Sequence, residues 1–102
     1  MAYVPLIKVV PQFFDSLGNP LVGGTLSAYV AGTTTPTNMY SNNSGTVAGT
    51  SVTLDSRGEP TTIKLIWIDT AVNYKFILKD SSSSTIWTID NIVPSDLVDG
   101  FV

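Results

Sequence analysis

Apolar and polar residues alternate over short stretches for most of the chain, and this two-residue period is typical of half-buried β-strands. In residues 24–31, Leu26, Ala28 and Val30 fall on one face of the expected strand. Residues 61–69 are apolar on both faces over most of their length, which predicts a strand covered on both sides. The expected strands are residues 12–15, 24–31, 38–40, 51–54, 61–69, 74–79 and 85–92.

Turn-forming residues separate the expected strands. Residues 15–20 combine Asp, Ser, Gly, Asn and Pro, and residues 55–58 end on the glycine that type I turns favour at their fourth position. Residues 41–49 have the composition of a loop. Four carboxylates stand at turn entries, where a side-chain oxygen that accepts backbone N–H bonds has its usual structural role. These carboxylates are Asp15, Asp55, Asp69 and Asp80.

The pattern predicts a single all-β domain, a small β-sandwich or barrel of about seven short, mostly antiparallel strands with an extended N-terminal arm. No apolar run is long enough to span a bilayer. We expect an apolar arm over residues 1–11, the β domain over residues 12–93, and a linker to a following segment over residues 94–102. The arm has two explanations: it lies on the domain or on a neighbouring molecule, or it is the first strand of the same sheet.

The composition has little charge. Charged residues are 13% of the 102 residues and hydrophobic residues are 43%, which is enough apolar material for one core. Such a surface is either partly covered by partner molecules or made polar by Ser, Thr and Asn, and both explanations stay open. The net charge of −3 argues against nucleic acid and against an anionic membrane surface as partners.

The residue types limit the available chemistry. The chain has no cysteine and no histidine, which excludes disulfides, cysteine zinc sites and histidine acid–base catalysis. The run from Asp80 to Ser84 has only one carboxylate, too few for a calcium loop. We therefore expect no catalytic residue, no cofactor and no metal ion, and a protein that is not an enzyme.

The aromatic residues allow two interpretations. Aromatic side chains in strands usually belong to a core or an interface, but a row of them can also stack against sugar rings. The residues in question are Tyr29, Tyr40, Trp67, Tyr74, Phe76 and Trp87.

The order of five motifs resembles a known family. Residues 13–36 read Phe-Phe-Asp-x-x-Gly-x-Pro-Leu-x-Gly-Gly-x-Leu-x-x-Tyr-x-Ala-Gly-Thr-x-Thr-Pro. The other motifs are Tyr-Ser-Asn at 40–42, Val-Thr-Leu-Asp-Ser-Arg-Gly-Glu at 52–59, Tyr-Lys-Phe-Ile-Leu-Lys-Asp-Ser at 74–81 and Ile-Trp-Thr-Ile-Asp-Asn-Ile at 86–92. Together they resemble the N-terminal virion-anchoring domain of tailed-phage tail fibres and tailspikes, including the head-binding domain of podovirus tailspikes. The sequence departs from that pattern at Thr50-Ser51, where related sequences often have Asn-Pro.

The resemblance implies a structural role. Such domains are all-β homotrimers that attach a receptor-binding protein to tail, portal or adaptor proteins of the virion, after assembly in the host cytoplasm. Any enzymatic or adhesive activity lies in later domains, and the family has no catalytic residues to carry over. From the residues themselves, we expect the apolar arm and exposed strand edges to form the partner interface. The arm residues of this expected interface are Tyr3, Val4, Leu6, Ile7, Val9 and Val10.

Two other functions stay open. The run from Asp15 to Gly23 suits a transthyretin-like or carboxypeptidase-regulatory-like β-sandwich of a surface protein equally well. A carbohydrate-binding module that uses Trp67 and Trp87 is the third interpretation.

Overall fold

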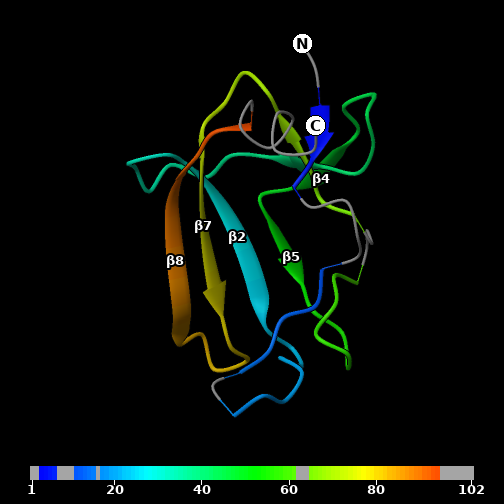
Figure 1. The fold of residues 1–102 in the computed structure, drawn as a ribbon, viewed down its shortest axis with the longest axis vertical. Coiled ribbons are helices and arrows are strands. Elements are labelled where there is room, and N and C mark those ends of the chain that lie inside the picture. Colours follow the sequence, from blue (N-terminus) through cyan, green and yellow to red (C-terminus); the bar gives the residue numbers. More distant parts are fainter. Residues whose placement is uncertain (1–2, 7–10, 16, 62–64, 95–102) are drawn as a thin grey trace.

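The computed structural model describes residues 3–6, 11–15, 17–61 and 65–94. Within these residues, eight strands form two four-stranded antiparallel sheets (Figure 1). The prediction of a small all-β sandwich is therefore confirmed. The strands are β1 (Tyr3–Pro5), β2 (Thr25–Val30), β3 (Met39–Tyr40), β4 (Val47–Gly49), β5 (Ser51–Thr53), β6 (Trp67–Asp69), β7 (Tyr74–Lys79) and β8 (Thr85–Ile92).

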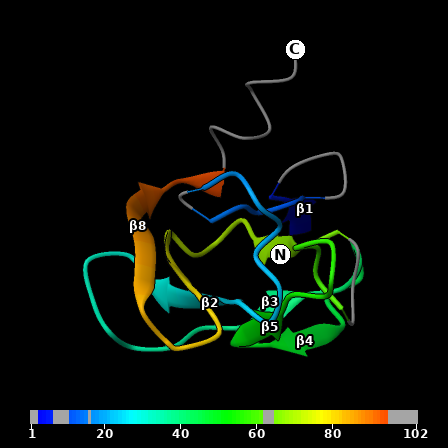
Figure 2. The ribbon, with the colours of Figure 1, turned by 90° about the horizontal axis from the view of Figure 1, so that it is seen from below.

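The sandwich is joined along one side and separated along the other. The first sheet has the order β1-β6-β3-β4, and the second has the order β5-β2-β7-β8. Only Thr50 separates β4 from β5, so the chain crosses between the sheets there, and Ala28 N–H donates to Thr50 O at 2.9 Å. The edge strands β1 and β8 consequently flank the opposite side of the sandwich, as Figure 2 shows from below.

The core lies between the two sheets and follows the predicted alternation. Tyr74, Phe76 and Leu78 of β7 are buried, whereas the residues between them are half-buried. The rings of Tyr74 and Phe76 stack with their centres 5.6 Å apart. Burying one such side chain contributes roughly 1.5–3 kcal/mol. The buried apolar residues are Leu21, Leu26, Ala28, Met39, Val52, Leu54, Ile66, Ile68, Tyr74, Phe76 and Leu78.

Three expectations about strands are corrected by the structure. Residues 47–49, expected to be loop, form β4, because a tight hairpin pairs them with β3. The strand expected over residues 61–69 is shorter: β6 begins at Trp67, although residues 62–64 lie outside the described part. Residues 12–15 make only one β-bridge, between Phe14 and Pro20, instead of a ladder, since Pro20 has no N–H to donate.

The N-terminal segment begins as a strand of the first sheet. Tyr3 and Pro5 pair with Asp69 and Trp67 of β6, and Leu6 N–H donates to Ile66 O at 2.7 Å. For these residues the structure shows the second of the two explanations given for the arm. Residues 7–10 and 95–102 lie outside the described residues, so the arm and linker boundaries stay predictions. The described part of the chain contains no helix with the length and apolar character needed to cross a membrane.

Candidate functional site

The turn carboxylates are bonded to the backbone, as predicted. In the turns that follow Asp15, Asp55 and Asp80, Oδ1 accepts the N–H groups two and four residues further on, at 2.8 to 3.2 Å. The N–H of each of these residues donates to the carbonyl four residues on, at 2.8 or 2.9 Å. Asp69 Oδ1 accepts the N–H of Ala71 at 2.8 Å. These oxygens therefore stabilise turns.

A fourth turn of this kind has an asparagine in place of the aspartate. Asn42 Oδ1 accepts the N–H groups of Ser44 at 2.9 Å and Thr46 at 3.3 Å. The Ser41 N–H donates to Thr46 O at 2.8 Å, which closes the hairpin between β3 and β4. The sequence signal that would have found β4 is this Asn-x-x-Gly spacing, which matches the turns at Asp15 and Asp55.

Two of these turns pack tightly against each other through Gly58. This residue has φ +75°, and a Cβ on it would meet the carbonyl oxygen of Phe13 and lie 3.0 Å from the nitrogen of Leu21. The N–H of Phe13 donates to Gly58 O at 2.9 Å, and the N–H of Leu21 donates to Phe13 O at 2.9 Å. The segment around Asp15 is thus fixed against the segment that follows Asp55.

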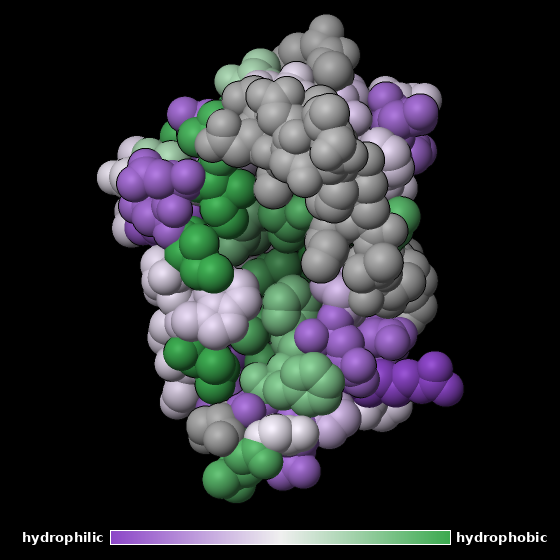
Figure 3. Space-filling view, in the orientation of Figure 1, coloured by the Kyte–Doolittle hydropathy of each residue, from purple (hydrophilic) through white to green (hydrophobic). Residues whose placement is uncertain are grey.

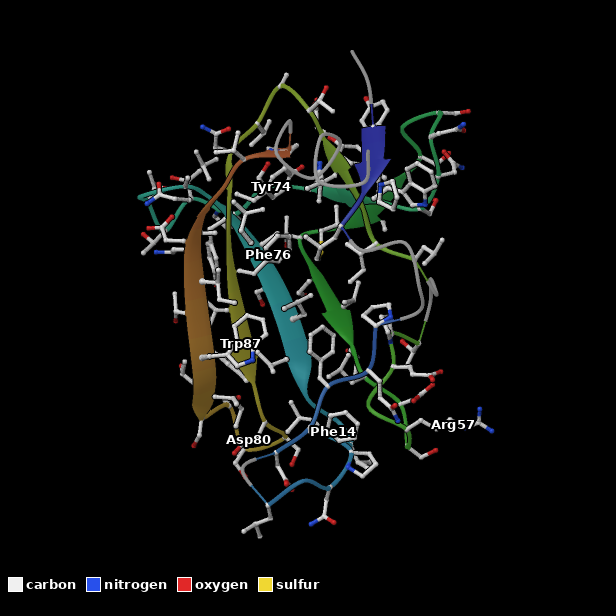
Figure 4. All side chains as sticks on the ribbon, in the orientation of Figure 1. Phe14, Arg57, Tyr74, Phe76, Asp80 and Trp87 are labelled. Carbon is white, nitrogen blue, oxygen red and sulfur yellow. The ribbon has the colours of Figure 1, made fainter. Side chains whose placement is uncertain are left out.

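This end of the molecule exposes large apolar side chains, which we call the apolar tip (Phe14, Leu17 and Val22). Leu17 is 83% exposed and Val22 is 57% exposed, and Phe14 is also exposed. Figure 4 places Phe14, Arg57 and Asp80 at the same end, with the Arg57 side chain extending into solvent. Large apolar side chains that stand together in solvent mark sites of contact with other proteins. The apolar tip is therefore the main candidate contact surface, and sequence reasoning missed it.

Apolar surface continues along the side between β8 and the N-terminal segment. The ring centres of Trp87 and Phe13 lie 6.1 Å apart, and Ile89 is exposed although it pairs with buried Phe76. Figure 3 shows apolar side chains along the middle of this side, with hydrophilic side chains at its upper left and lower right. The described residues enclose no pocket, so this is an open surface.

The edge strand β8 is interrupted by two irregularities. Ile86 has no partner in the register with β7, and two residues, Asp90 and Asn91, oppose the single residue Lys75. Asn91 has φ +58°, and such bulges limit uncontrolled pairing at a sheet edge. The N–H groups of Gly32 and Asn91 donate to Asp90 Oδ1 and lower the pKa of that carboxyl below its usual value. Asp90 therefore ties β8 to the loop after β2.

The arm residues expected to contact a partner are placed in part. The ring of Tyr3 lies 4.7 Å from that of Tyr40 and covers Gly45, where a Cβ would lie 2.6 Å from ring atoms. Leu6 packs against the core of its own domain, and Val4 is in register with Ile68. Ile7, Val9 and Val10 lie outside the described residues.

Asp69 and three tyrosines form a polar cluster near the end of β6. The Tyr74 hydroxyl accepts a hydrogen bond from the N–H of Asp69 and donates one to Asn38 O, both at 3.0 Å. Burial raises the pKa of Tyr74 to about 12, against the opposing effect of the Asp69 hydrogen bond. Burial, with smaller effects of Asp69 and Tyr3, also raises the pKa of Tyr40.

The two tryptophans lie on different faces of the sandwich. Ile66 and Ile68 on either side of Trp67 are fully buried, so Trp67 points away from the core. Trp87 pairs with buried Leu78 and therefore points to the inner face of the second sheet. A single sugar platform that contains both tryptophans is consequently wrong.

Comparison with known proteins gives no relative. No protein-family model matches the chain, and no curated protein matches it. Within the described residues, no group of three or more carboxylates is arranged to hold a metal ion.

Proposed function

We propose that this chain is a structural, non-enzymatic virion component: the N-terminal anchor that attaches a tailed-phage tail fibre or tailspike to the tail or portal region. The observation that carries the proposal is the apolar tip, where large apolar side chains stand in solvent on turns fixed by hydrogen bonds. Exposed apolar side chains grouped in this way mark protein contact sites.

The apolar tip suits tight attachment because hydrogen bonds hold the backbone that carries it. The Leu17 N–H is held by Asp15 Oδ1 at 2.9 Å, and Gly58 fixes the neighbouring backbone. Binding through such a surface loses little conformational entropy, so more of the apolar contact energy appears as affinity. The partners are tail, portal or adaptor proteins of the virion, and the chain acts as a homotrimer.

The family resemblance gives stronger support to an anchor-like fold than to the identity of the partner protein. Asp15, Gly18, Asp55 and Gly58, which carry much of the resemblance, build the turns. The alternative function, a transthyretin-like or carbohydrate-binding module of a surface protein, has no support from a paired platform of Trp67 and Trp87, since Trp67 lies on the outer face of the first sheet and Trp87 on the inner face of the second.

The test is a deletion. The protein that carries this chain is produced, with and without residues 1–102, in infected cells that lack the natural copy, and its amount in purified particles is measured by mass spectrometry. Loss of the truncated protein from particles, at equal expression, supports the anchor. Equal incorporation of both forms overturns it.

A further inference from the structure

The outer face of the first sheet carries an aromatic cluster that the anchor does not use. Trp67 points outward, and its register partners on the two neighbouring strands are Pro5 and Tyr40. Residues directly opposite each other in antiparallel strands share a face, so these side chains lie together. Tyr3 lies on the same face, two residues before Pro5, and contacts Tyr40 with ring centres 4.7 Å apart. We call this surface the aromatic face (Tyr3, Tyr40, Trp67 and Asp69).

A carboxylate lies at the end of the aromatic face. Asp69 is register partner of Tyr3 and is only 5% exposed. Its Oδ1 accepts the N–H of Ala71, and Oδ2 accepts no hydrogen bond within the described residues. Asp69 stands opposite Tyr3 in the register, and the Tyr3 ring contacts that of Tyr40, so the carboxylate belongs to the same face as both rings. Oδ2 and the tyrosine hydroxyls thus provide polar groups beside the aromatic rings.

The charge of the aromatic face selects its ligand. The four strands of this sheet contain no lysine or arginine, whereas Lys75 and Lys79 belong to the second sheet. The carboxylate of Asp69 would repel a phosphate, sulfate or carboxylate ligand, and the described strands of this sheet provide no cation to balance that charge. A neutral molecule with an apolar face and hydroxyl donors has no such conflict.

We propose that the aromatic face binds a neutral saccharide. One sugar ring stacks its C–H face on Trp67 and Tyr40, and a sugar hydroxyl donates to the carboxylate of Asp69. The electron-rich face of an aromatic ring attracts the weakly positive C–H groups, and stacking removes apolar area from water. This site differs from the paired tryptophans considered from the sequence, and it does not depend on the anchor function.

The test uses the intact chain and its two tryptophan indole signals. Hexamers of glucose, N-acetylglucosamine, mannose and galactose are titrated against the 15N-labelled protein, and the indole N–H resonances are followed by NMR. We expect at least one hexamer to shift the Trp67 resonance while that of Trp87, on the inner face of the second sheet, stays in place. Absence of a Trp67 shift with all four, or a shift of Trp87 alone, overturns the proposal.

Variants separate the ligand contact from a structural effect. Tyr40→Ala is expected to weaken binding about tenfold, since loss of one aromatic contact is worth up to ~1.5 kcal/mol. Asp69→Asn keeps the shape and should also weaken binding, whereas Trp87→Phe should leave the affinity unchanged. Equal affinity of all three variants contradicts the assignment. If a variant fails to fold, the indole shifts of the unmodified chain still decide.

Discussion

The hydroxyl of Tyr74 accepts a hydrogen bond from the backbone N–H of Asp69 at 3.0 Å, and this contact joins the two sheets of the sandwich. Tyr74 lies in β7 of the second sheet and Asp69 in β6 of the first. The same hydroxyl donates to Asn38 O at 3.0 Å, so one buried oxygen satisfies two backbone groups.

Tyr74→Phe should therefore destabilise the fold. The change leaves the Asp69 N–H and the Asn38 carbonyl without this partner, which costs about 1–3 kcal/mol for a buried group. Tyr29→Phe is the matched control, since the Tyr29 ring keeps its position 5.8 Å from Lys75 Nζ. Urea unfolding measures the free energy of unfolding of both variants. Equal stability of the two would show that the Tyr74 hydroxyl contributes nothing to the fold.

Alkaline pH should weaken the fold through the same residue. Because burial raises the pKa of Tyr74 from 10.0 to about 12, the folded chain keeps a proton in this window that the unfolded chain has lost. The stabilising contribution is complete below pH 10 and is lost as the pH rises towards 12. The free energy of unfolding should thus fall across this window, and less steeply for Tyr74→Phe. The same pH dependence in the unmodified chain and in Tyr74→Phe would show that Tyr74 does not cause the loss of stability.

Gly58→Ala should be far more damaging than Gly18→Ala. Both glycines have positive φ, which costs an alanine about 1–2 kcal/mol. At Gly58 the new Cβ also meets the backbone of Phe13 and Leu21, whereas nothing lies within 4 Å of a Cβ on Gly18. Backbone displacement of this kind adds about 1–3 kcal/mol. Thermal unfolding of the two variants tests this, and an equal loss would argue against close packing of the two turns.

Acid should release the loop after β2 from β8. The Gly32 N–H donates to Asp90 Oδ1 at 3.0 Å, and this bond helps to lower the pKa of Asp90 below 3.8. The stability that this hydrogen bond adds is present at pH values above the ordinary pKa of an aspartate. It is lost as the pH falls through the lowered pKa of Asp90. The Gly32 amide resonance should follow this titration, with a midpoint below 3.8, and Asp90→Asn should abolish the change. A midpoint at or above 3.8 would contradict the hydrogen bond.

The sequence predicts elements where local physics decides the structure. β7 matches its expected range because alternation is unbroken there, and β8 matches its range although two irregularities interrupt its pairing. Asp15 and Asp55 stabilise turns because the required donors are only two to four residues away. The short strand β4 was missed because Val-Ala-Gly has no alternation and depends on a hairpin with β3.

Features that depend on distant parts of the chain could not be predicted. The position of Tyr3 against Tyr40 needs the pairing of β1 with β6, and the placement of the two tryptophans on different sheet faces needs the order of both sheets. The exposure of Leu17 also escaped prediction, because an apolar residue in a turn gives no local sign of whether the core covers it.

The most direct test of the anchor is transfer of function. Residues 1–102 are fused to a fluorescent protein and produced during infection, and the fluorescence of purified particles is measured. The account predicts particle-bound fluorescence for the fusion, about tenfold less for Leu17→Ser with Val22→Ser, and no loss for Val47→Ser. Val47 is a matched control because it is 58% exposed, compared with 57% for Val22, but lies in β4. Particles that carry no more of the fusion than of the fluorescent protein alone would contradict the account.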